Sequence, residues 1–92
     1  MEDTFYRYLE FERRSSNNTL ISYRTDLEQF KKFYNNLSYS EEITKADKRS
    51  IRSWIIELSV NNNSKKTINR KIATLKSYYK FLVKRGIIQS NP

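Results

Sequence analysis

The 92-residue chain carries a formal net charge of +8, and this excess lies entirely in its last third. Residues 1–62 hold ten basic and ten acidic side chains, whereas residues 63–92 hold eight basic and no acidic ones. The chain has no cysteine and no histidine, which excludes disulfide and thiolate-metal frameworks, the commonest metal ligand and the usual acid–base group at neutral pH. We therefore expect no metal, no other cofactor and no catalytic residue.

No apolar run approaches the ~20 residues that a membrane span needs, and the N-terminus lacks a signal-peptide pattern. We expect a single small domain, residues 1–92, that is soluble and cytoplasmic or associated with the bacterial nucleoid, with no membrane partner.

Two helices are predicted in the first half of the chain, over about residues 3–13 and 18–35. In both, apolar side chains recur at steps of three and four residues, which is the spacing of one helix face. The polar run between them supplies several candidate N-cap residues. The stripe residues are Phe5, Tyr8 and Leu9 in the first helix and Leu20, Tyr23, Leu27, Phe30 and Tyr34 in the second.

Two further helices are predicted in the second half, over about residues 45–60 and 65–85. Thr44 precedes the third in a pattern close to a capping box, and Ser64 is the expected N-cap of the fourth. Gly86 fits the position after the last helical turn, where a left-handed backbone is common. The stripe residues are Ile51, Trp54, Ile55 and Leu58 in the third helix and Ile68, Ile72, Leu75, Tyr79 and Leu82 in the fourth.

No strand pattern competes with these helices, so the predicted fold is all-α, a four-helix bundle. Aromatic residues at helical spacing indicate core, most clearly for Trp54, Tyr23 and Tyr79 and less so for Tyr78. The carboxylate pair Glu41–Glu42 lies in a polar loop with no partner base, and we interpret it as solvated.

The fourth helix separates its charge from its apolar stripe. At about 100° per residue, the opposite face carries basic, amide and small side chains and no acid. Because the first three helices mix charge signs and this one does not, we favour a nucleic-acid surface over an ordinary solvated face. The residues on and beside this face are Lys66, Asn69, Arg70, Ala73, Thr74, Lys76, Ser77, Lys80 and Lys84.

An α-helix fits the major groove of B-form DNA, which is about 12 Å wide. Ala73, Thr74 and Ser77 are small enough to allow a close approach, lysines at the rims can contact phosphates, and Asn69 and Arg70 can reach base edges. The start of the second helix, from Asn18 onward, is a possible companion surface, because helix N-termini favour phosphate.

Two stretches of the sequence resemble the N-terminal core-binding domain of tyrosine recombinases, the phage integrase family. Residues 19–30 are similar to the family pattern T-L-x-x-Y-x-x-D-L-x-x-F. Residues 64–82 are similar to S-x-x-T-I-x-R-K-L-S-A-L-R-S-F-Y-x-Y-L, and the ending Asn91-Pro92 also fits. The resemblance covers essentially the whole chain and implies a SAM-like orthogonal four-helix bundle that clamps one side of a recombination site.

In the family, the second and fourth helices face the DNA major groove. Transferred by position, this resemblance implies DNA contacts by Thr19, Ser22, Arg24, Lys65, Lys66, Thr67, Arg70, Lys71 and Lys76. To these we add Asn18 at the start of the second helix, and Asn69 and Lys80 on or beside the acid-free face of the fourth. The implied partners are double-stranded DNA, the catalytic domain of the same parent chain and other recombinase protomers on DNA. The family's catalytic residues lie on a separate domain, so we expect this chain to be excised from a longer recombinase and not to cleave or join DNA.

Two other functions remain open. The chain could be a stand-alone helical DNA-binding regulator that ends at Pro92. It could instead be a protein–protein interaction module that uses Ile87, Ile88 and the basic face on an acidic partner, since two isoleucines in the tail need either a partner or the bundle itself to cover them.

Overall fold

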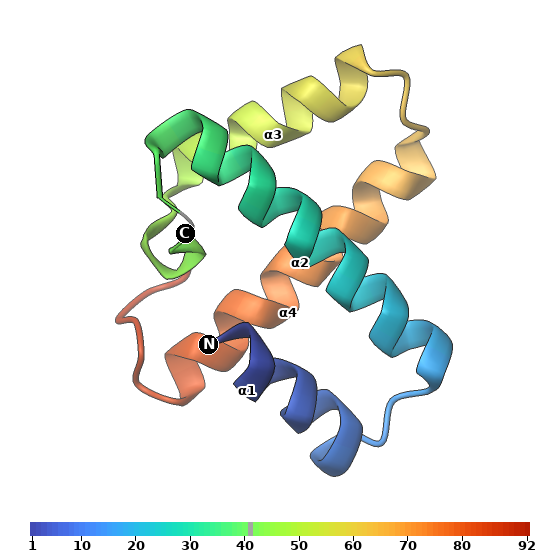
Figure 1. The fold of residues 1–92 in the computed structure, drawn as a ribbon, viewed down its shortest axis with the longest axis vertical. Coiled ribbons are helices and arrows are strands. Elements are labelled where there is room, and N and C mark those ends of the chain that lie inside the picture. Colours follow the sequence, from blue (N-terminus) through green and yellow to red (C-terminus); the bar gives the residue numbers. More distant parts are fainter. Residues whose placement is uncertain (41) are drawn as a thin grey trace.

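Four α-helices form the fold in the computed structural model, which describes residues 1–40 and 42–92 (Figure 1). They are α1 (Glu2–Arg7), α2 (Asn17–Ser38), α3 (Lys48–Val60) and α4 (Lys65–Lys84). A π-helical segment, Tyr8–Glu12, continues α1, and a 3-10 turn, Ile43–Lys45, precedes α3. The described residues contain no strand, which confirms the predicted all-α class.

The first predicted helix does not continue as one regular α-helix. From Tyr8 onward it has π-helical hydrogen bonding, in which the Arg13 N–H donates to the Tyr8 carbonyl at 3.1 Å. Such segments are rare and shift the side chains that follow around the helix axis. Phe11 is 70% exposed, while Phe5 and Leu9 are fully buried.

The predicted start of the third helix was wrong by three residues. Lys45, which we assigned to its first turn, ends the 3-10 turn instead, and α3 begins at Lys48. The N-cap is Asp47, whose Oδ1 accepts a hydrogen bond of 2.9 Å from the Ser50 N–H. Asp47 caps the helix in place of Thr44 because its carboxylate accepts a hydrogen bond from an amide at the positive end of the helix dipole. Of the loop pair, Glu42 is exposed and contacts Lys45 at 3.0 Å, whereas Glu41 lies outside the described residues.

Both ends of α4 follow the prediction. The Ser64 hydroxyl accepts a hydrogen bond from the Thr67 N–H at 3.1 Å. Gly86 has a φ of +71°, and the Ile87 N–H donates back to the Leu82 carbonyl at 2.9 Å. This is the Schellman arrangement, which suits glycine because a side chain resists positive φ. It turns the tail back, so that Ile88 packs against the core while Ile87 is 37% exposed.

The long helices α2 and α4 cross at the centre of the bundle, with α1 packed on one side of the crossing and α3 on the other (Figure 1). Aromatic side chains fill both sides. The Phe5 ring lies 5.3 Å from that of Tyr78, and the Phe30 ring lies 5.1 Å from that of Trp54. Tyr78 is fully buried and therefore belongs to the core. No helix among residues 1–40 and 42–92 has the length and apolar character needed to span a bilayer.

Candidate nucleic-acid interface

The outward face of α4 is a continuous strip of exposed, basic and small side chains. Its six exposed positions recur at steps of three and four residues, and none is acidic. We call this strip the basic face; it comprises Lys66, Asn69, Ala73, Lys76, Lys80 and Lys84. The strip forms because the opposite side of the helix supplies the core through residues such as Leu75 and Leu82, and helical periodicity turns the basic residues away from them.

A groove of about 340 Å³ separates the basic face from the N-terminal half of α2. Asn18, Thr19 and Ser22 line it from α2, and Arg70 and Ala73 line it from α4. Two groups of predicted site residues, more than forty positions apart in the sequence, therefore border one surface depression. Deeper along the same junction, the Tyr23 hydroxyl lies 3.4 Å from that of Ser77.

A second groove, of about 330 Å³, extends the basic surface toward α1. Lys80 and Lys84 line one side, and Arg13, just after the π-helical segment, lines the other. Arg13 was not among the predicted site residues. It lies within residues 1–62, whose charges balance, so only the folded arrangement brings it beside the lysines of α4.

Asp26 is a fully buried carboxylate at the α2–α4 junction. Its Oδ1 accepts hydrogen bonds from Arg70 Nη2 at 2.8 Å and Lys71 Nζ at 2.9 Å. Its Oδ2 accepts from Thr74 Oγ1 at 2.8 Å and Arg70 Nε at 3.3 Å. The sequence contained a signal for this role, because an acid three residues after Tyr23 and four before Phe30 lies on the apolar stripe.

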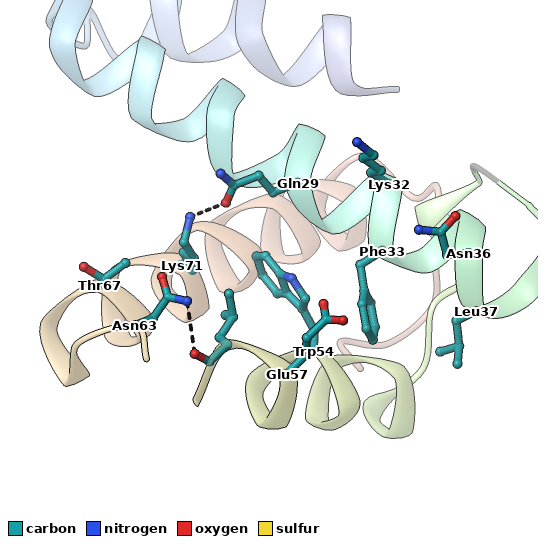
Figure 2. A pocket seen from close by; sticks show the side chains of 11 residues that line it. Gln29, Lys32, Phe33, Asn36, Leu37, Trp54, Glu57, Asn63, Thr67 and Lys71 are labelled. Atoms are coloured by element: carbon teal, nitrogen blue, oxygen red, sulfur yellow. Dashed lines mark hydrogen bonds between the residues drawn. The ribbon is translucent and has the colours of Figure 1, made fainter. Parts of the chain in front are cut away.

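The structure corrects two predicted positions on α4. Lys71 is 3% exposed, and its ammonium donates to Gln29 beneath the surface (Figure 2). It also donates to Asp26. Thr74 is 4% exposed and donates a hydrogen bond to Asp26, so it is not one of the small outer side chains that we expected to allow a close approach to DNA. Both lie nearer the core stripe than the basic face, and the buried carboxylate supplies the polar partner that such burial requires.

Lys71 and Thr67 line a different groove, of about 540 Å³, which is formed by α2, α3 and α4 on the α3 side of the bundle (Figure 2). This groove also carries the Glu57 carboxylate and the aromatic side chains of Phe33 and Trp54. Its mixed charge distinguishes it from the basic face, so we do not assign these residues to the DNA-facing surface.

Comparison with known proteins matches residues 3–86 to the family described as the phage integrase N-terminal SAM-like domain. The chain belongs to this family. The match includes all of α2, α3 and α4, and with them the basic face and both of its grooves, and it confirms the SAM-like bundle expected from the sequence.

Curated relatives of this SAM-like domain are named tyrosine recombinase XerC. The protein from Listeria welshimeri is 36% identical over 94 residues, an alignment that covers 100% of this chain and 30% of the relative. Those from Oceanobacillus iheyensis and Roseiflexus castenholzii are each 37% identical over 92 residues, covering 98% of this chain and 29% and 28% of the relatives. The chain thus spans about a third of their length. No solved structure matches it significantly.

The remaining predicted residues of the SAM-like domain are exposed but do not all share one surface. Lys65 is exposed in the first turn of α4. Arg24 is exposed on the flank of α2 that faces α1, where its guanidinium carbon lies 4.6 Å from the centre of the Tyr6 ring. It lines neither groove beside the basic face, so it is a peripheral member of the predicted site.

Proposed function

We propose that this chain is the DNA-binding domain of a tyrosine recombinase and that it contacts duplex DNA through the basic face and the N-terminal half of α2. The observation that carries this proposal is the basic face itself. It presents four lysines, an asparagine and an alanine on one exposed helix surface without an acid. An α-helix with its side chains is about 10–12 Å across, which matches the width of the major groove.

The flanking surface suits the sides of such a groove. The α2 N-terminus projects amide N–H groups and the polar side chains Asn18 and Thr19, which can bond phosphate oxygens. On the α1 side, Arg13 adds a further positive charge. Phosphate contacts of this kind position a protein on DNA, whereas base contacts give specificity.

Recombination would require the remainder of a recombinase. The relatives are about three times as long as this chain, and we propose that the catalytic domain of the same parent protein and further protomers on DNA are partners of the domain. The chain has no histidine, and the described residues contain no cluster that could hold a metal ion. We propose that it binds DNA without cleaving it.

Amide chemical-shift mapping tests this proposal. Duplex DNA titrated into the isotope-labelled chain at low salt should shift amides from residues 18–22 and from the outer positions of α4, while amides of α3 remain unchanged. An acidic peptide of equal charge serves as the control. Shifts that are equal for both ligands, or confined to the tail around Ile87, would support a protein-interaction module instead. No shift with DNA would refute DNA binding.

A supercoiled plasmid incubated with the chain tests the absence of catalysis. We expect retarded migration with no nicked or relaxed product. Protein-dependent nicking that survives a second purification step would contradict a purely DNA-binding role.

A further inference from the structure

Asp26 connects the core of the domain to the surface groove between α2 and α4. It is fully buried, yet two of its partners, Arg70 and Thr74, line that groove. Each carboxylate oxygen accepts two hydrogen bonds, all of them from α4. The orientation of the carboxylate is therefore fixed on both edges.

The charges in this cluster are not balanced. Lys71 is buried and lies 2.9 Å from Asp26, so it supplies the counter-charge that a buried carboxylate needs. The side chain of Arg70 is 49% exposed, and its positive charge is in excess. Buried ion pairs often contribute no more stability than well-packed apolar side chains would. Stability alone therefore does not account for a second cation on Asp26.

The geometry leaves one edge of the Arg70 guanidinium available. Nε and Nη2 donate to Asp26, which occupies one side of the planar fork. No other described side chain accepts a hydrogen bond from Arg70, so the N–H groups of Nη1 and the outer N–H of Nη2 are free to donate into the groove. A paired set of N–H groups on a guanidinium matches the O6 and N7 acceptors of guanine.

We propose that Asp26 is a positioning residue that holds Arg70 in the orientation needed for bidentate hydrogen bonding to a guanine in the major groove. The proposal rests on the DNA-binding function proposed above. An unrestrained arginine loses rotamer freedom when it binds, whereas one already held on its Nε side loses less. Lys71 and Thr74 contribute indirectly, because their hydrogen bonds hold the Asp26 carboxylate in place and that carboxylate orients Arg70.

The test begins with selection of preferred duplexes from a random-sequence library by the unaltered chain. Each guanine of the selected duplex is then replaced in turn by 7-deazaguanine, which lacks the N7 acceptor. One position should weaken binding by about 5- to 150-fold, the range expected for one bidentate base contact. In Asp26→Asn this penalty should fall below about 3-fold. In Arg70→Lys the penalty should fall by the same amount. Combining Asp26→Asn with Arg70→Lys should reduce the penalty no further than either substitution alone.

Three features keep the experiment decisive. The penalty is a ratio of two affinities measured on one protein preparation, so any unfolded fraction cancels. If Asp26→Asn alone does not fold, Asp26→Asn with Lys71→Met removes both buried charges and should lose the penalty as well. The matched control is Lys80→Ala on the basic face, which should weaken binding to both duplexes and leave the penalty unchanged.

The outcomes distinguish failure of the positioning role from failure of the DNA-binding function. Retention of the full penalty in the Asp26 variants, or independent effects of the Asp26 and Arg70 substitutions, would overturn the positioning role. DNA binding with no enriched sequence, or with no guanine whose replacement matters, would overturn it too, while leaving the DNA-binding function intact. Failure of the unaltered chain to bind any duplex at low salt would refute the function itself.

Discussion

Removing single lysines from the basic face should change the salt dependence of DNA binding by a predictable amount. Five exposed bases border the face or its grooves without an acidic partner among the described residues: Lys66, Lys76, Lys80, Lys84 and Arg13. If each neutralises one phosphate, the slope of log K against log salt should be about −4.5. Affinity should then fall about 500-fold between about 50 and 200 mM salt.

Lys80→Ala should reduce the slope by about 0.9, so that the same change in salt costs only about 150-fold in affinity. Fluorescence anisotropy with a labelled duplex measures both slopes. Lys48→Ala is the matched control: it removes the same charge from the first turn of α3, which contributes no residue to either groove beside the basic face. It should therefore leave the slope unchanged.

An equal fall in slope for both variants would show that the salt dependence of DNA affinity follows the net charge of the domain and not the basic face. A slope near zero for the unaltered chain would refute phosphate neutralisation altogether.

Three further predictions concern the fold that supports this face. Asp26→Ala leaves the Lys71 ammonium buried without a counter-charge and should lower the free energy of unfolding by about 3–5 kcal/mol in urea melts followed by tryptophan fluorescence; a loss below about 1 kcal/mol would contradict this. Tyr79→Phe removes the 2.6 Å hydrogen bond to the Ile43 carbonyl, which keeps a second one from the Ala46 N–H at 3.1 Å, and should cost about 0.5–1.5 kcal/mol in the same assay. Tyr6→Phe removes a buried hydroxyl that has no partner among the described residues and should cost almost nothing; equal costs would refute the comparison. Hydrogen bonds from Ser50 hold the pKa of Asp47 below its ordinary value. The carboxylate's contribution to stability is therefore complete above about pH 4 and is lost as the pH falls through the lowered pKa. Asp47→Asn should make the free energy of unfolding fall less steeply at acid pH, and an unchanged fall would contradict the assignment.

Local chemistry predicted most of the helices. The apolar stripes identified α2 and α4, and the Ser64 cap and Gly86 marked the ends of α4, because hydrogen bonding within a few residues decides such features. The same reasoning failed at Tyr8, where the chain changes to π-helical bonding, and at Thr44, where Asp47 caps α3 instead. At the start of α3 two local capping signals competed, and the Asp47 carboxylate supplies the hydrogen bond to the Ser50 N–H.

The sequence by itself determined the class of the fold and the basic face of α4, because helical periodicity and charge spacing are one-dimensional properties. Only the tertiary structure decided which of these residues are accessible. Lys71 and Lys76 are indistinguishable as lysines in a basic helix, yet the first is buried against Asp26 and the second is exposed. The crossing of α2 over α4 makes this distinction: it brings a buried carboxylate beside three α4 side chains and leaves Arg70 half exposed at the groove.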